Sequence, residues 1–187
     1  LLATALVLPQ QPAAGPGPDP APIRAAVITG ANNHDWQWTS REIAGTLRET
    51  GRFEVEVVED PAQWLADAGQ RAQRGELHVL VLDYNGPRWG EAPERGFLAA
   101  VQGGVGVAVL HAADNAFPGW SDYERLVGLL WRDGTGHGAF HPFDVVVVDP
   151  HHPITAGMAD LRKHPDELYH RLVPAPGHDH RVLLSAY

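Results

Sequence analysis

One apolar run, residues 105–110, places the strongest constraint on how this chain can fold. The run follows the turn pair Gly103 and Gly104, reads Val-Gly-Val-Ala-Val-Leu, and stops at His111. A short apolar run between turn residues is typical of a strand buried on both faces, as in a parallel sheet. Because ligands bind at the carboxyl ends of parallel strands, His111 is a candidate site residue. The alternative is a polar strand end that bonds to a neighbouring loop.

Similar short runs alternate along the chain with segments of helical pattern. Thr39 or Ser40 is the predicted cap of the first helix, and Glu42 is placed to complete a capping box. The alternation predicts an α/β layer fold with a mostly parallel sheet. We expect strands at 23–29, 53–58, 77–82 and 143–148, and helices at about 39–49, 61–74, 93–101 and 121–130.

Composition excludes several classes of function. A net charge of -9 argues against a nucleic-acid partner, since phosphate binding needs a basic surface. The chain has no cysteine, which excludes disulfides, thiolate metal sites and a cysteine nucleophile. A metal site would therefore use histidine nitrogens and carboxylate oxygens, a donor set that suits a divalent metal such as zinc. With 187 residues, we expect one main domain.

The two ends of the sequence differ from the middle. Residues 1–8 are apolar and residues 9–22 are rich in Pro, Ala and Gly, which predicts a signal-peptide remnant followed by a linker. We therefore expect an exported protein, periplasmic or extracellular; the alternative is a disordered extension of a cytoplasmic one. The apolar stretch is too short for a membrane span. Residues 23–187 form the predicted domain, and the strand-like segment 181–187 suggests that it continues further.

Three polar clusters follow predicted strands, at residues 32–36, 83–85 and 111–115. Since parallel strands end at the same edge of a sheet, these clusters should converge on one pocket. Tryptophans beside polar groups can bind sugars, although most aromatic residues belong to the core. The candidate substrate-binding residues are Asn33, His34, Trp36, Asn85 and Asn115.

The second half of the chain is rich in histidine. His137 and His141 are four residues apart, but flanking Gly and Pro favour a loop. Glu167 and His170 are three apart, so one helical turn would place carboxylate and imidazole on the same face. We take Glu167 as a candidate catalytic residue, and His137, His141 and His170 as candidate metal ligands. The alternative for the Glu167 pair is an exposed helix end with a local ion pair.

Five motifs occur in the order ITGANNHDW at 28–36, VLHAA at 109–113, FPGW at 117–120, HHPI at 151–154 and DELY at 166–169. Together they resemble the ThuA-like family, which is named for trehalose utilisation. The resemblance extends over residues 24–187 and implies a flavodoxin-like three-layer sandwich of the class I glutamine amidotransferase-like superfamily. Amidotransferases of that fold carry a cysteine on the turn where this chain has His111, so a glutaminase mechanism through a thioester is excluded.

The resemblance implies a link to carbohydrate metabolism, with trehalose, another disaccharide or a keto-sugar as the small-molecule partner. Our first hypothesis is a sugar-modifying enzyme in which His111 and Glu167 are catalytic, by acid–base or metal-assisted chemistry. The second is a non-catalytic sugar-binding or scaffold module of a larger exported protein. A third assigns the histidines to a structural zinc site. A homo-oligomer is compatible with all three.

Overall fold

The computed structural model describes residues 21–187 of the chain. Residues 1–20, which contain most of the predicted signal-peptide remnant and linker, lie outside this described part. Within residues 21–187, no helix has both the length and the apolar character needed to cross a membrane.

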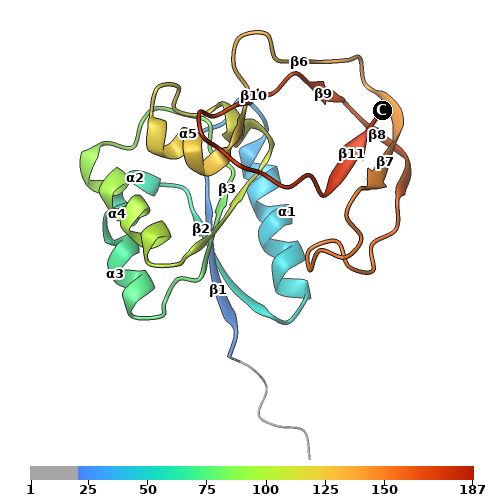
Figure 1. Ribbon diagram of the computed structural model, residues 1–187. Coiled ribbons are helices and arrows are strands. Elements are labelled where there is room, and N and C mark those ends of the chain that lie inside the picture. The colour runs from blue at the N-terminus through green and yellow to red at the C-terminus, as the bar shows by residue number, and fades with distance from the viewer. Residues whose placement is uncertain (1–20) are drawn as a thin grey trace, which may run out of the picture.

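A four-stranded, wholly parallel sheet forms the centre of the molecule (Figure 1). The order β2-β1-β3-β4 matches the first four strands of the flavodoxin-like arrangement. The predicted α/β flavodoxin-like fold is therefore confirmed. The strands are β1 (Ile23–Ile28), β2 (Phe53–Val58), β3 (Val79–Leu82) and β4 (Gly106–Val109).

Helices cover both faces of this sheet and complete the three layers (Figure 1). Helix α1 (Trp36–Glu49) packs on one face, where it contacts β1 and β2. Helix α4 packs on the opposite face against the segment before β3. The elements of that face are α2 (Pro61–Trp64), the 3-10 helix η1 (Leu65–Asp67), α3 (Ala68–Gln73) and α4 (Glu91–Gln102).

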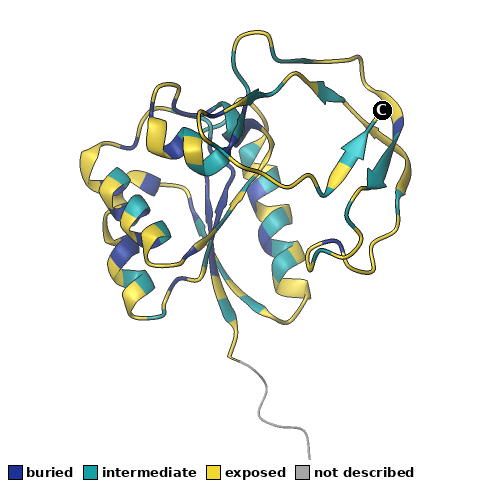
Figure 2. Cartoon of the chain, viewed as in Figure 1, coloured by how far each residue is buried: buried dark blue, intermediate teal, exposed yellow. Residues whose placement is uncertain are grey.

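The residues of the central strands are mostly buried (Figure 2). Successive side chains point to opposite faces of the sheet and so belong to two separate core clusters. Val27 and Val81 pack with Ala44 of α1 on one face. Ile28 and Leu82 belong to the larger cluster on the other face, which includes Phe97 of α4.

Helix α4 approaches the preceding segment closely at Gly96. A Cβ there would lie 2.0 Å from the carbonyl oxygen of Leu65, so a side chain at this position would push the two elements apart. The close packing depends on a residue without a side chain.

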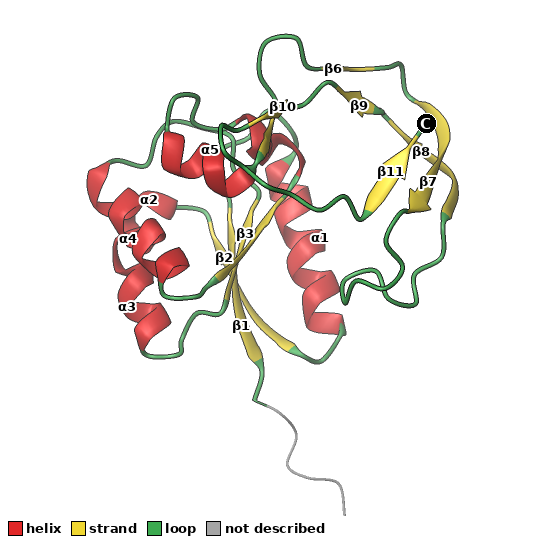
Figure 3. Cartoon of the chain, viewed as in Figure 1, coloured by secondary structure: helices red, strands yellow, loops and turns green. Residues whose placement is uncertain are grey.

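The second half of the chain adds a short helix and three small antiparallel sheets (Figure 3). The sheets pair β5 with β10, β6 with β9, and β7 with both β8 and β11. The elements are α5 (Ser121–Val127), β5 (Leu129–Leu130), β6 (Gly136–His137), β7 (His141–Val147), β8 (Leu161–Asp166), β9 (Tyr169–His170), β10 (Val173–Pro174) and β11 (Leu184–Ala186).

Two strand predictions need correction. β4 is half-exposed rather than buried on both faces, because it lies at the edge of the sheet with β3 as its only paired neighbour in the described part. The strand expected at 143–148 exists as β7, but it pairs antiparallel with β8 and β11 outside the central sheet. Apolar content predicts a strand, and sheet order decides its burial.

Three helix predictions also differ from the structure. α1 begins at Trp36, because the Asp35 carboxylate accepts a hydrogen bond from the backbone N–H of Trp38 and caps the helix there. The expected helix 61–74 is divided by η1 into α2 and α3. α5 stops at Val127, since the next residue, Gly128, has a φ of 84°.

Candidate functional site

Asp83, at the carboxyl end of β3, anchors the loop that follows β1. Its carboxylate accepts hydrogen bonds from Asn32 Nδ2 at 3.1 Å and from Thr39 Oγ1 at 2.6 Å. Asn32 Oδ1 in turn accepts from the backbone N–H of His34 at 3.2 Å. Burial raises the pKa of Asp83, and its two side-chain hydrogen bonds oppose that shift. The network fixes the backbone that carries His34.

Gly30 allows this loop to leave β1 in the observed direction. Its φ is 107°, and a Cβ would lie 2.0 Å from the carbonyl oxygen of Glu59. The loop therefore needs glycine at this point. A second link, from Asn85 Nδ2 to Asn33 Oδ1 at 3.1 Å, joins the ends of β3 and β1.

His111 lies on the sharp turn after β4, as the first residue of the 3-10 helix η2 (His111–Asn115). Its φ of 44° is in the left-handed region, which is unfavourable for a residue with a side chain and recurs at functional sites. The turn directs the imidazole towards two partners. His111 Nε2 lies 3.1 Å from His34 Nε2 and 3.0 Å from the Tyr169 hydroxyl.

The surroundings of His111 favour its neutral form. Burial lowers the pKa of His111, and the neighbouring His34 lowers it further. The charges of Asp166, Glu167 and Asp83 act in the opposite direction and do not cancel the shift. A hydrogen bond between the two Nε2 atoms also requires one ring nitrogen without a proton. A neutral imidazole at this position can accept a proton from a ligand.

Asp114, three residues further along η2, is the most strongly perturbed acid of the site. Burial raises its pKa to about 6, although the positive charge of Arg132 opposes the shift. Its Oδ1 atom is buried and has no hydrogen-bond partner among the described residues. A carboxyl group in this state can hold a proton in weakly acidic solution and release it near neutrality.

A pocket of about 160 Å³ opens beside this cluster. Asn33, His34 and Asn115 line it, as the sequence predicts for a substrate site. Asn85 and His111 are not lining residues: Asn85 donates to Asn33, and His111 contacts His34 and Tyr169, all of which line the pocket. Trp36 is the first residue of α1 and does not line the pocket. The full lining is Asn33, His34, Ala112, Asp114, Asn115, Trp131 and Tyr169.

Glu167 occupies a different position from the one expected. The helix that should unite Glu167 and His170 does not form, because β8 ends at Asp166 and β9 begins at Tyr169. Glu167 Oε2 lies 3.5 Å from His137 Nδ1, and both side chains are exposed. The carboxylate does not line the pocket, yet its charge raises the pKa of His111.

The three histidines taken as candidate metal ligands point to separate partners. His137 Nδ1 lies 2.8 Å from the Gly138 carbonyl oxygen, and His141 Nδ1 lies 2.7 Å from that of Ala139. His170 Nδ1 accepts from Arg171 Nε at 3.2 Å. Across residues 21–187, no three His, Asp or Glu side chains form a cluster suited to a metal ion. The described geometry therefore does not make these histidines one ligand set.

Sequence reasoning did not select three residues of the site: Asp114, Trp131 and Tyr169. Asp114 and Tyr169 fall within clusters that the sequence already marked, at 111–115 and 166–169. Tyr169 reaches His111 because β9 pairs with β6, and Trp131 packs edge-to-face on Tyr169 with ring centres 4.8 Å apart. No local pattern predicts that long-range pairing.

The sheet order and the polar site at its carboxyl edge define an α/β protein of the flavodoxin-like class. The family model for ThuA, described as trehalose utilisation, matches residues 24–187, and the chain belongs to this family.

Solved structures show the same relationship. A ThuA-like protein from Parabacteroides merdae ATCC 43184 is 32% identical with a TM-score of 0.74; the match covers 89% of this chain and 68% of that one. A ThuA-like protein from Bacteroides uniformis ATCC 8492 is 20% identical with a TM-score of 0.67, covering 92% and 71%, and shows the fold alone. The sequence has no significant match among curated proteins.

Proposed function

We propose that this ThuA-family chain is a sugar-modifying enzyme in which His111 transfers a proton next to the carbonyl group of a keto-sugar. One observation carries the proposal: the imidazole of His111, held in its neutral form, meets His34 and Tyr169 beside a polar pocket. The family's link to trehalose utilisation supports a carbohydrate as substrate.

The chemistry is a reversible proton transfer. His111 takes a proton from the carbon next to the sugar carbonyl, and the electron pair of that C–H bond forms the C=C bond of an enediol. The Tyr169 hydroxyl or the protonated Asp114 carboxyl donates a proton to the carbonyl oxygen. In an isomerisation, His111 then returns the proton to the former carbonyl carbon, and the hydroxyl group on the other enediol carbon gives its proton to the deprotonated donor as the new C=O bond forms. Both groups regain their starting protonation states, and no other reactant is consumed.

The remaining polar side chains would bind and orient the sugar. Asn33 and Asn115 offer amide donors and acceptors to hydroxyl groups, and Asn85 holds Asn33 in place. His34 both lines the pocket and lowers the pKa of His111. Glu167, outside the pocket, acts on His111 through its charge.

Turnover of keto-sugars by the wild type and His111→Gln tests the proposal. We expect loss of the imidazole to lower kcat by about 100-fold or more, the usual contribution of a general base, while sugar binding remains. His151→Gln, which changes an exposed histidine away from the pocket, is the matched control. Equal turnover by wild type and His111→Gln would reject the catalytic role. Binding without turnover by the wild type would favour the non-catalytic sugar-binding module.

A further inference from the structure

His34 is the imidazole that lines the pocket of about 160 Å³. Its side chain is exposed, whereas His111 is absent from the pocket lining. The Nε2 atoms of the two rings lie 3.1 Å apart, and the ring centres are 4.6 Å apart. A proton held on Nε2 of His111 therefore has a second imidazole nitrogen within hydrogen-bond distance, on a ring that is open to solvent.

The loop after β1 holds His34 in this position. The backbone N–H of His34 donates to Asn32 Oδ1 at 3.2 Å, and Asn32 Nδ2 donates to the buried carboxylate of Asp83 at 3.1 Å. Within residues 21–187, the hydrogen bonds of the His34 ring join it to Asn33 and His111 and to no carboxylate. The backbone is thus fixed, while no negatively charged partner keeps a proton on the ring.

His34 is also the one base in hydrogen-bond contact with Nε2 of His111 among the described residues. The other contact, the Tyr169 hydroxyl at 3.0 Å, belongs to a phenol, which donates to imidazole and is too weak a base to take a proton from imidazolium. The Asp83 carboxylate is engaged by the loop, and Asp114 Oδ1 has no hydrogen-bond partner in the described part of the chain. A proton that leaves His111 for another side chain therefore passes to His34.

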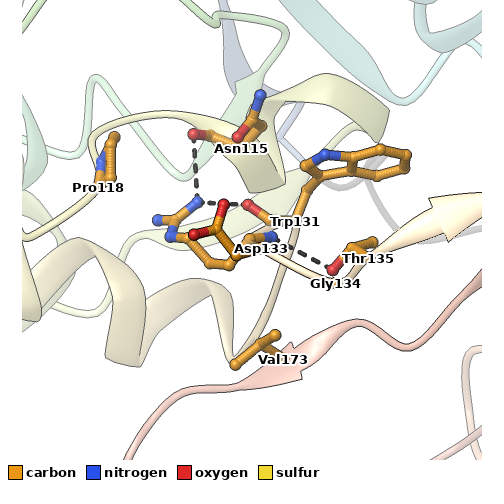
Figure 4. Close-up of a pocket in the computed structure, with 8 residues that line it drawn as sticks. Asn115, Pro118, Trp131, Asp133, Gly134, Thr135 and Val173 are labelled. Carbon is orange, nitrogen blue, oxygen red and sulfur yellow. Dashed lines mark hydrogen bonds between the residues drawn. The ribbon is translucent and has the colours of Figure 1, made fainter.

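The larger cavity next to the pocket offers no other route for this proton. Its volume is about 630 Å³, and Asn115 and Trp131 line both spaces (Figure 4). Neither His34 nor His111 belongs to the lining of the larger cavity. Exchange with solvent is therefore expected on the side of the smaller pocket, where His34 lies.

We propose that His34 exchanges the substrate-derived proton on His111 with solvent during turnover. The inference rests on the proposed function, because it follows the proton after His111 has taken it from carbon. The proton passes from Nε2 of the His111 imidazolium to Nε2 of neutral His34, which becomes the cation. His34 releases it to water, takes up a solvent proton and returns that one to His111. Both rings regain their starting states, and nothing is consumed.

Deuterated keto-sugars separate direct return of the proton from exchange. Fructose, tagatose and sorbose, each with deuterium at C1, are isomerised in ordinary water, and NMR measures deuterium at C2 of the aldose early in the reaction. Deuterium at C2 reports direct return by His111, and hydrogen reports exchange. We expect His34→Ala to raise the ratio of retained to exchanged product by about tenfold or more, since the positioned proton acceptor is lost. His151→Ala, an exposed histidine away from the pocket, is the matched control and should keep the wild-type ratio.

Chemical rescue distinguishes proton exchange from a structural role of His34. The alanine leaves space beside His111, so added 4-methylimidazole should return the ratio in His34→Ala towards the wild-type value and leave the wild type unchanged. A ratio in His34→Ala equal to that of the wild type would overturn the relay. So would complete retention of deuterium by the wild type, or a raised ratio or lost turnover in His34→Ala that 4-methylimidazole does not restore.

These outcomes are distinct from failure of the proposed function. If His34→Ala behaves like the wild type, loss of turnover in His111→Gln still supports proton abstraction by His111. Absence of isomerisation of all three keto-sugars by the wild type would overturn both.

Discussion

The Tyr169 hydroxyl lies 3.0 Å from His111 Nε2, although 58 positions separate the two residues in the sequence. Burial raises the pKa of Tyr169, so the phenol keeps its proton and remains a donor near neutral pH. The same nitrogen of His111 lies 3.1 Å from His34 Nε2. Two groups thus compete for one ring nitrogen, and its protonation depends on both.

Tyr169→Phe should separate the hydroxyl's role from that of the ring. The phenyl ring can still pack on Trp131, while the hydrogen bond to His111 is lost. We expect kcat to fall by about tenfold, equivalent to one hydrogen bond, and the free energy of unfolding to change by less than about 1 kcal/mol. Steady-state kinetics and urea unfolding measure the two effects. An unchanged kcat would show that the hydroxyl takes no part in turnover.

His34→Asn should shift the pH dependence of activity. His34 contributes to the lowered pKa of His111, so its removal should let that pKa rise towards its ordinary value of 6.5. On acidification, the variant should therefore lose activity at a higher pH than the wild type, because its His111 becomes protonated sooner. The measurement is the acidic limb of the kcat/KM profile for both proteins. A limb that stays in place or moves to lower pH would contradict the assignment.

Asp114→Asn should change stability in a pH-dependent way. The pKa of Asp114 in the folded state, about 6, exceeds its ordinary value of 3.8. Protonated Asp114 therefore makes its whole contribution to the free energy of unfolding below pH 3.8, and this contribution is lost as the pH rises through about 6. Asparagine has no charge to bury. We expect the variant to gain about 1–2 kcal/mol at pH 8, after allowance for solvent screening, and about nothing at pH 4.

Urea unfolding at the two pH values gives these numbers for Asp114→Asn. Asp122→Asn, at an exposed position on α5, serves as the control and should show no such gain at pH 8. A gain of equal size at pH 4 and pH 8 would mean that packing, rather than the buried charge, sets the difference.

Arg132 should be required to hold the turn that carries His111 and Asp114. Its guanidinium forms a partly buried ion pair with Glu124 and donates to backbone carbonyl oxygens of this turn, including that of Asn115. We expect Arg132→Leu to lose about 2–4 kcal/mol of unfolding free energy, since it leaves the Glu124 carboxylate without its cationic partner and backbone carbonyl oxygens without their donor.

The control for Arg132→Leu is Arg95→Ala, which removes an exposed ion pair with Glu91 within α4. Such a pair contributes only about 0.3–0.5 kcal/mol. Chemical denaturation compares the two variants directly. Similar losses in both would show that Arg132 has no special part in supporting the turn.

The central sheet could be predicted because its strands are short apolar runs between turn residues. The runs that become β1, β2, β3 and β4 are all visible in the sequence. Their order and burial were harder to predict, as β4 shows, because an apolar strand at the edge of a sheet has the same composition as one in the middle. The antiparallel pairing of β7 depends on partners far along the chain, which local patterns do not specify.

The candidate site shows the same limit. Parallel strands bring the residues after β1, β3 and β4 to one edge, which explains why His34 and His111 could be selected from sequence. Tyr169 and Trp131 reach the site through the β6–β9 pairing and the chain after β5, and no periodicity marks those contacts. The spacing of Glu167 and His170 predicts a helix, but Glu167 lies in the connection between β8 and β9.

Proton transfer by His111 is tested most directly by exchange of substrate hydrogen with the solvent. Wild type and His111→Gln are each incubated with a keto-sugar in D₂O, and deuterium at the carbon next to the carbonyl is measured by NMR. We predict incorporation by the wild type and a rate lower by about 100-fold or more in the variant. Equal rates in the two proteins, or none above the uncatalysed background in the wild type, would contradict the role assigned to His111.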